Sequence, residues 1–269
     1  MIKITQQEAD EAVRLHYLWL DDSKTGKRAD FRNKDLSGLN FKGNDLRDAH
    51  FKGANLSNTN LHYVDLMYTN LSDTNLSFAD LTGASLFRAD LQGTDLKGAD
   101  LSGTDLSYSN LSNADLNNAD LSNADLRGTN LSNANLSYAN LSYANLSKAD
   151  LGCANLGYTT LKGANFSGAN LSGANLDDTN LNGTVLREVI FNDVILDGVA
   201  FTSKPTTKDK KMTTILNMDG YNNRYNLPNG DLAKVVRVSP RGKFVTCHSG
   251  NTYLVSATGT QRASLRVVK

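Results

Sequence analysis

The chain has 269 residues, of which 39% are hydrophobic and 21% charged, with three Pro and one Trp. It shows no apolar run long enough to span a membrane and no charged-then-apolar leader, so we expect a cytoplasmic protein without membrane spans. Cys153 and Cys247 are isolated, which excludes a disulfide framework or a cysteine metal site. The zero net charge conceals an asymmetry: residues 30–201 carry 20 acidic and 11 basic residues, whereas residues 202–269 carry 3 and 12.

Residues 1–29 predict a short helix. Thr5 and Glu8 have the spacing of a capping box, and apolar side chains recur over residues 6–21. We expect an N-terminal helical cap on the repeats that follow, because the open end of a repeat array exposes unpaired strand edges. A partner-binding helix is the alternative.

A five-residue repeat fills residues 30–201. Every fifth residue from Phe31 to Phe201 is Leu or Phe, in 35 successive positions. The residue two before each of these centres is small and faces inward, the residue one before is usually Asp or Asn and faces outward, and the second residue after is a corner residue. Gly, Asn or Asp at corners suits the positive φ of a type II turn. Four pentapeptides then make one coil of twenty residues, and nearly nine coils stack at about 4.8 Å.

The repeat resembles the pentapeptide repeat family, whose A(D/N)LXX pattern is present in residues 134–141, Ala-Asn-Leu-Ser-Tyr-Ala-Asn-Leu. The resemblance covers about two thirds of the chain. It implies an all-β solenoid, a right-handed quadrilateral β-helix of about nine coils over residues 30–201. Family members that resist gyrase poisons are thought to imitate DNA with an acidic rod.

The last coils differ from the others at their outward positions. Val185, Ile190 and Ile195 replace Asp or Asn there, so these strands are apolar on both faces. Strands of that kind are usually covered on both sides. We therefore predict a docking surface for the C-terminal segment, with an oligomer interface as the alternative.

Residues 202–212 have the composition of a linker, and residues 213–269 predict a small basic β-rich domain. Short β-type runs at 233–238, 243–248, 252–257 and 264–268 alternate with turn signals. Its basic side chains allow either docking on the acidic rod or binding of nucleic acid, and the absence of a recognition signature favours the former. The basic residues are Arg237, Arg241, Lys243, Arg262, Arg266 and Lys269.

Outward carboxylates gather between residues 80 and 125, in a set that we call the acidic belt. Stacked Asp pairs one coil apart would repel by roughly 0.9 kcal/mol in water, a cost that Asn would avoid. We therefore expect the belt to bind a partner. It comprises Asp80, Asp90, Asp95, Asp100, Asp105, Asp115, Asp120 and Asp125.

Aromatic side chains form a second candidate contact surface. Exposed Tyr together with Arg is typical of interaction hot spots, although Tyr could equally stiffen the corners of the rod. The candidate residues are Tyr68, Arg88, Tyr108, Tyr138, Tyr143 and Tyr158.

No residue pattern indicates catalysis. The four histidines lack metal spacing, and the serines follow the repeat and not a nucleophile motif. We therefore expect no cofactor, no metal and no enzymatic activity. The sequence favours a scaffold that presents a rigid surface to a protein partner. One alternative is a local DNA mimic that inhibits or protects a DNA-binding enzyme such as a topoisomerase; another is nucleic-acid binding by the C-terminal domain.

Overall fold

The computed structural model describes residues 1–181, 183–192 and 194–195 in full. Farther along, it describes only the backbone of strands β4 to β9. The last two repeat centres, the expected linker at 202–212 and the side chains of the basic C-terminal segment lie outside the described residues.

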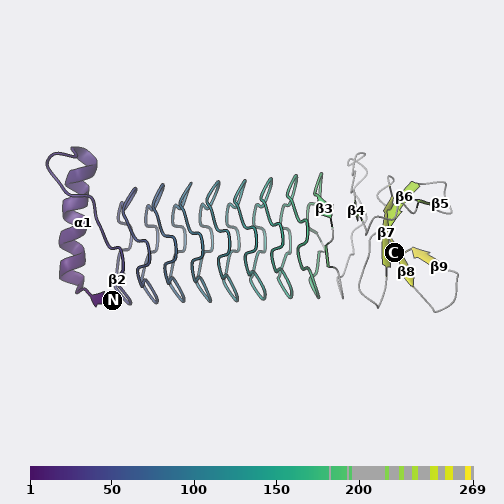
Figure 1. Ribbon diagram of the computed structural model, residues 1–269, viewed down its shortest axis with the longest axis horizontal. Coiled ribbons are helices and arrows are strands. Elements are labelled where there is room, and N and C mark those ends of the chain that lie inside the picture. Colours follow the sequence, from purple (N-terminus) through teal and green to yellow (C-terminus); the bar gives the residue numbers. More distant parts are fainter. Residues whose placement is uncertain are drawn as a thin grey trace.

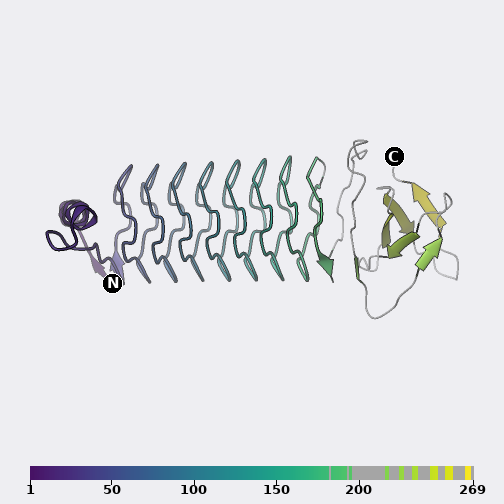
Figure 2. The same ribbon diagram turned by 90° about the horizontal axis from the view of Figure 1, so that it is seen from above.

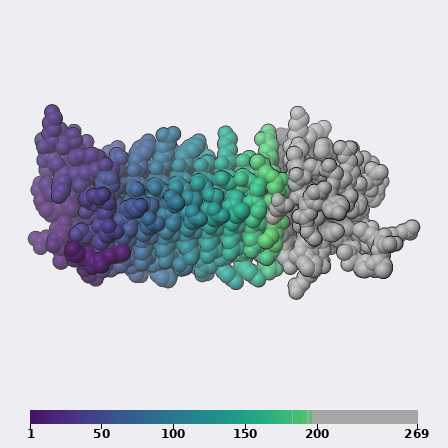
Figure 3. Space-filling model, viewed as in Figure 1, coloured from purple at the N-terminus to yellow at the C-terminus, as the bar shows by residue number. Residues whose placement is uncertain are grey.

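The repeats wind into a stack of coils, each made of four pentapeptides. Each outward position forms a parallel bridge with the equivalent position in the next coil, from Asp30 with His50 to Asn175 with Ile195. The backbone bonds run in both directions across each step: Leu36 N donates to Asn55 O at 2.8 Å, and Asn55 N donates to Lys34 O at 2.9 Å. The coils therefore stack in register (Figure 1), and the coloured part of the space-filling view shows their side chains packed into a continuous rod (Figure 3).

Every corner residue from Asn33 to Glu188 has a positive φ, between 52° and 73°. At most corners, the residue after it donates its N–H to the carbonyl of the repeat centre, as Ala79 does to Leu76 at 3.1 Å. The expected turn is thus confirmed. However, 20 of these corners are not glycine, although a left-handed conformation costs ordinary residues about 1–2 kcal/mol each.

The core is a column of Leu and Phe with small residues between them. The centres from Phe31 to Leu181 are at most 3% exposed. Most inward threonines satisfy their buried hydroxyl locally; Thr69 Oγ1, for example, donates to Leu66 O at 2.5 Å. A polar residue can therefore replace Ala inside the coil without leaving an unpaired group.

The N-terminal segment lies across the first coil. Strand β1 (Ile2–Lys3) pairs in parallel with β2 (Lys34–Asp35), and helix α1 spans Gln6–Asp21. Thr5 and Glu8 form the expected capping box, which satisfies two N-terminal N–H groups. The helix stands upright at the end of the rod in Figure 1 and is seen along its axis in Figure 2.

Side chains of α1 hydrogen-bond to the free backbone edge of this coil. Gln6 exchanges two hydrogen bonds with the backbone of Asn40, at 2.8 and 2.9 Å, and the Tyr17 hydroxyl accepts the N–H of Asp45 at 3.0 Å. Buried His16 accepts the N–H of Ala29 at Nδ1, so its Nε2 carries the proton donated to Arg47 O. The helix thus supplies partners that another coil would otherwise provide.

At the other end, β3 (Phe191–Asn192) pairs in parallel with β4 (Leu216–Asn217). The partner of Phe191 is Leu216, which lies one pentapeptide farther along the chain than the regular step between coils would place it. The sequence does not predict this pairing, because the Leu/Phe repeat ends at residue 201.

The remaining strands form one antiparallel meander, in the order β5-β6-β7-β8-β9. A strand lies in each of the four β-type runs expected from the sequence, and β5 was not expected. Their bounds are β5 Arg224–Asn226, β6 Leu232–Val235, β7 Lys243–Cys247, β8 Thr252–Ser256 and β9 Ser264–Val267. In the part of the chain that the structure describes, no helix is long and apolar enough to cross a membrane.

Candidate interaction surfaces

The outward Asp and Asn side chains shape the corners. At most outward Asp and Asn positions, Oδ1 accepts the backbone N–H two residues later; Asp100, for example, accepts from Ser102 at 3.0 Å. This Asx turn holds the chain as it enters the corner. Asp and Asn perform it equally well, which is why both occupy the position.

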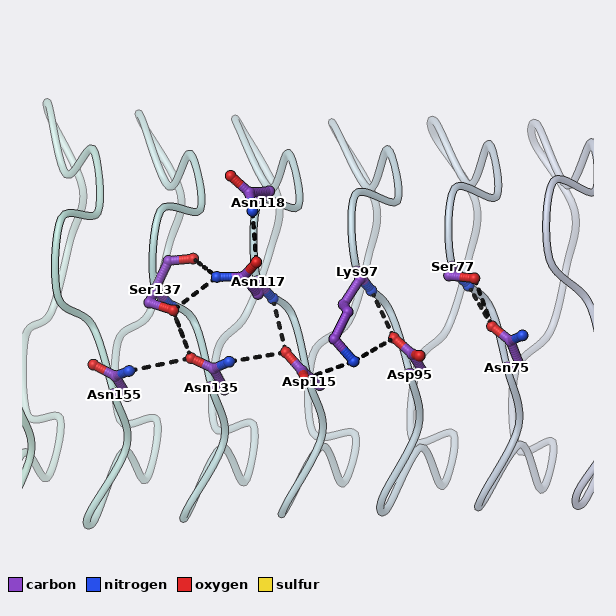
Figure 4. A network of polar contacts seen from close by, with 10 residues as sticks. All are labelled: Asn75, Ser77, Asp95, Lys97, Asp115, Asn117, Asn118, Asn135, Ser137 and Asn155. Carbon is purple, nitrogen blue, oxygen red and sulfur yellow. Dashed lines mark hydrogen bonds and ion pairs between the residues drawn. The ribbon is translucent and has the colours of Figure 1, made fainter.

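Asn also bonds along the rod, always in one direction. In the hydrogen bonds found between outward side chains of adjacent coils, the Nδ2 of an Asn donates to Oδ1 of the residue one coil earlier, as Asn135 does to Asp115 at 2.9 Å. Asn155 in turn donates to Asn135 at 3.2 Å (Figure 4). An Asp that is followed by an Asn one coil later therefore accepts a hydrogen bond from that Asn. Where an Asp is followed by another Asp, the later carboxylate has no N–H group to donate.

The acidic belt encircles the rod instead of lying on one side. Because equivalent positions of successive coils stack, its eight carboxylates fall into four columns. The largest set in one column is Asp80, Asp100 and Asp120, which we call the Asp80 column. The other columns hold Asp95 with Asp115, Asp105 with Asp125, and Asp90 without another member of the belt.

Cations accompany the stacked pairs outside the Asp80 column. Lys97 Nζ lies 3.3 Å from Asp95 and 2.8 Å from Asp115 (Figure 4). Arg127 pairs with Asp125 at 2.6 Å. Nearer the N-terminus, Arg47 pairs with Asp45 and lies 3.6 Å from Asp65.

The Asp80 column has no Lys or Arg within ion-pair distance among the described residues. His62 Nδ1 lies 3.7 Å from Asp80 Oδ1, and Asn140 donates to Asp120 at 3.1 Å. Burial acts to raise the pKa of Asp80, but hydrogen bonds from Thr82 and the nearby His62 outweigh it and hold that pKa below its usual value. Asp80 is therefore ionised at neutral pH. Asp100 occupies the same column one coil later.

Four of the corner aromatic rings lean over a glycine one coil later. A Cβ added to Gly98 would meet Phe78 at 2.6 Å, and one added to Gly163 would meet Tyr143 at 2.6 Å. Tyr63 covers Gly83 and Tyr108 covers Gly128 in the same way. These four rings lie against the corner of the following coil and remain exposed.

The candidate aromatic residues lie on three different corners. Tyr68, Arg88 and Tyr108 share one corner with Phe87, a residue that was not among the expected contacts. The Phe87 ring makes edge contacts with Tyr68 at 5.8 Å and Tyr108 at 6.0 Å, and Arg88 lies 5.3 Å above it. The signal was present, because Phe87 and Ser85 both depart from the repeat.

The remaining tyrosines form separate contacts. Tyr138 and Tyr158 stack with ring centroids 4.9 Å apart and an interplanar angle of 3°. Tyr143 lies on another corner, where Lys162 approaches its ring at 5.7 Å. These residues do not join the Phe87 cluster into a single surface.

Val185, Ile190 and Ile195 lie in three different columns at the last described coil, each 47% exposed. Although these apolar side chains accept no hydrogen bond, the Asn side chains one coil earlier keep their partners, because Asn165 and Asn170 donate toward the N-terminus. What covers these side chains remains a prediction, because the side chains that follow lie outside the described residues.

Within the described residues no cluster of three or more His, Cys, Asp or Glu side chains could hold a metal ion. Stacked parallel coils with inward Leu and outward Asx define the class of protein as a parallel β-solenoid.

Comparison with known proteins gives the family. The family model for pentapeptide repeats matches in 8 copies, over residues 27–62, 65–103, 84–123, 94–133, 114–152, 129–168 and 164–202. The chain therefore belongs to the pentapeptide repeat family, whose solved members indicate the right-handed quadrilateral β-helix. A comparison with curated protein sequences gave no match.

Several solved structures are similar to the chain. HetL from Nostoc sp. strain PCC 7120, a pentapeptide repeat protein involved in heterocyst differentiation regulation, is 33% identical over 67% of this chain and 90% of HetL, with a TM-score of 0.32. QnrB1, a plasmid-mediated fluoroquinolone resistance protein, is 21% identical over 60% of this chain and 85% of QnrB1, with a TM-score of 0.53. The likeness to QnrB1 concerns the fold alone.

Proposed function

We propose that the chain is a non-enzymatic scaffold that binds a protein partner through the Asp80 column. The observation that carries this proposal is the uncompensated stack of three carboxylates, Asp80, Asp100 and Asp120. Other stacked aspartates are accompanied by Lys or Arg, so this column is where an external cation would contribute most. The fitting partner surface is a segment with Lys or Arg side chains spaced along it.

The surroundings of the column suit such a partner. Thr82, Ser102 and Ser122 are the outward neighbours, and the corners beside the first two carboxylates are Gly83 and Gly103. A Cβ at Gly103 would meet nothing within 4 Å. A basic side chain can therefore approach Asp100 without displacing a bulky neighbour.

Three further features belong to the proposal. Helix α1 would act as a cap that prevents another chain from pairing with the first coil. The basic C-terminal segment would cover Val185, Ile190 and Ile195 at the other end. A partner that normally binds DNA is the second candidate, because the Asp80 column is a row of closely spaced negative charges.

The test compares capture of proteins from host lysate by the native chain and by the triple variant D80N/D100N/D120N. The matched control D90N/D115N/D150N makes the same change in net charge outside the Asp80 column. Each of its three carboxylates accepts a hydrogen bond from an Asn one coil later. We expect the triple variant to lose the captured protein and the control to retain it. Capture should also weaken with added salt, since the contact is electrostatic.

Equal capture by all three proteins would overturn the role of the Asp80 column. Addition of duplex DNA separates the two kinds of partner: displacement identifies a DNA-binding partner and supports local mimicry. Labelled duplex mixed with the native chain alone checks the third reading, binding by the basic C-terminal segment, for which we expect no complex.

A further inference from the structure

Arg88 differs from the other arginines of the described residues. Of the seven arginines before residue 195, six lie within 4.0 Å of a carboxylate: Arg14, Arg28, Arg32, Arg47, Arg127 and Arg187. Arg88 has no such partner in the described part of the chain, and its guanidinium instead lies over the Phe87 ring at 5.3 Å.

The local sequence explains this difference. Three paired arginines follow an outward aspartate by two residues, in Asp30-x-Arg32, Asp45-x-Arg47 and Asp125-x-Arg127. In the coil of Arg88, Ser stands at the outward position 85 and Phe stands at 87. Phe87 thus occupies the position that an arginine holds in the three ion-paired segments, and Arg88 stands one residue later, at the exposed corner.

Positions 48 to 148 of this corner of the rod, which we call the Phe87 ridge, hold in order Asp48, Tyr68, Arg88, Tyr108, Gly128 and Lys148. Its centre holds Met67, Tyr68, Phe87, Arg88 and Tyr108, a composition enriched in protein interfaces. Tyr68 is 48% exposed and Tyr108 57% exposed.

The two ends of the ridge carry opposite charges. Asp48 stands at one end, with Arg28 at 3.9 Å as its ion-pair partner, and Lys148 stands at the other with no described carboxylate within 4.0 Å. The two positions are five coils apart, so about 24 Å separates them along the rod. They cannot pair within one molecule.

We propose that a second copy of this chain docks on the Phe87 ridge in antiparallel orientation. A two-fold axis between the coils of Arg88 and Tyr108 sets position 88 opposite position 108, and position 48 opposite position 148. Each Arg88 then meets Tyr108 of the second copy, with Asp105 of that copy at the same level. Each Asp48 meets Lys148 of the second copy. Arg88 and Lys148, which have no ion-pair partner among the described residues of one chain, thus each gain a contact, and the two-fold axis generates every contact twice.

The same operation accounts for the other charges of the ridge. Met67 faces Arg127 of the second copy. Asp65 faces Asp125 of the second copy, which already has Arg127 of its own copy at 2.6 Å. That arginine offsets the one like-charge contact that the arrangement creates along the ridge.

The size of the ridge predicts a weak dimer. Partly exposed Tyr, Phe, Met and Arg side chains bury roughly 400 Å² per copy, so about 800 Å² in total, below the 1,200–2,000 Å² of stable complexes. We expect a dissociation constant on the order of 10–100 µM. This inference does not depend on the proposed function, because the Asp80 column lies on a different part of the rod.

Sedimentation equilibrium of the full chain at concentrations up to several hundred micromolar tests the proposal, using D48K, K148D and the double variant D48K/K148D. Both corners already accommodate a non-glycine residue at positive φ, with Lys at 61° and Asp at 62°, so the exchange asks nothing new of the backbone. We expect each single variant to weaken dimerisation about tenfold or more. The double variant should recover it, because the reversed charges meet only between molecules.

K42D, at an exposed position away from the ridge, is the matched control and should dimerise as the native chain does. R88A should also weaken the dimer. A native chain that stays monomeric at every concentration would overturn the proposal. So would a dimer that is unaffected by the single variants, or one that the double variant fails to restore when circular dichroism shows it to be folded.

Discussion

At the residue scale, an outward Asn performs two hydrogen-bonding tasks and an outward Asp only one. Both accept the N–H that opens the corner, but only Asn can also donate to the coil before it. The distribution of Asp and Asn over the outward positions therefore determines where the rod carries negative charge. In the Asp80 column the chain has three acceptors in a row and no donor between them.

Replacing Asp100 by Asn should stabilise the protein. The new amide would donate to Asp80 Oδ1, and two like-charge steps of roughly 0.9 kcal/mol each would disappear. With screening we expect a gain of about 1 kcal/mol, measured by urea unfolding at low ionic strength.

D150N is the control for this prediction, because it gains an amide donor toward Asn130 without relieving a stack of aspartates. The advantage of D100N over D150N should shrink in high salt. An advantage that is independent of salt would show that charge repulsion does not contribute.

The sequence predicts the outward Asx column, its period and its like-charge steps. It does not reveal the direction of the amide bonds or the bridging of Asp95 and Asp115 by Lys97. Those depend on which side chains meet after the coil has closed. The coil length therefore assigns the belt to its columns from the sequence, but only the structure shows which columns a cation accompanies.

At the element scale, the corners combine a strained backbone with an aromatic cover. Phe78 leans over Gly98, and the same arrangement recurs at other corners. The pairing of an aromatic residue with a glycine one coil later can be recognised in the sequence once the coil length is known. What the sequence leaves open is whether such a ring serves packing or a partner.

Replacing Gly98 by Ala should destabilise the rod more than replacing Gly103 by Ala. Both glycines have a positive φ, of 61° and 65°, so both variants incur a backbone cost of about 1–2 kcal/mol. Only at position 98 would the new Cβ meet a ring, that of Phe78 at 2.6 Å. Chemical unfolding of the two variants measures the difference, and equal losses would mean that the ring moves aside without cost.

Helix α1 should hold the first coil less tightly in acid. Burial lowers the pKa of the His16 imidazole, and its Nδ1 must stay unprotonated to accept from Ala29. Since the folded-state pKa lies below the usual value near 6.5, this contribution is complete above pH 6.5 and is lost as the pH falls toward the folded-state value. The loss can reach about 1.4 kcal/mol per pH unit.

Trp19 stacks on His16 with centroids 5.4 Å apart and is the sole tryptophan, so its fluorescence reports this region directly. Urea unfolding followed by Trp19 emission at pH 5 and pH 7.5 measures the effect. His16→Gln retains a donor and an acceptor but does not titrate, and should reduce the pH dependence. An unchanged dependence would assign the effect to another group, such as His50.

At the scale of the whole molecule, the solenoid depends on the period and not on the number of coils. Each coil contacts only its neighbours, so stability is approximately a sum over coils and their interfaces. The repeat fixes this architecture from the sequence alone. The longer step between β3 and β4 could not be derived in that way, because the pattern that would mark it has ended by then.

Removing residues 130–134 should leave a folded protein with one pentapeptide fewer. Each later outward side chain would lie on the neighbouring face of the rod, one quarter of a coil away. Every Leu would still face inward. Removing only residues 130–132 would turn polar side chains inward beyond that point and should abolish cooperative unfolding. Circular dichroism and urea titration of the two deletions distinguish these outcomes, and similar stability would contradict the dependence on period.

The one-way direction of the amide bonds has a consequence for how the chain forms during synthesis. Each finished coil presents Oδ1 acceptors toward the coil that will follow, and the Asn donors arrive with that next coil. The ribosome therefore delivers side chains in the order in which they can be used. We expect the rod to lengthen vectorially as it emerges, with α1 as the first surface on which a coil can settle.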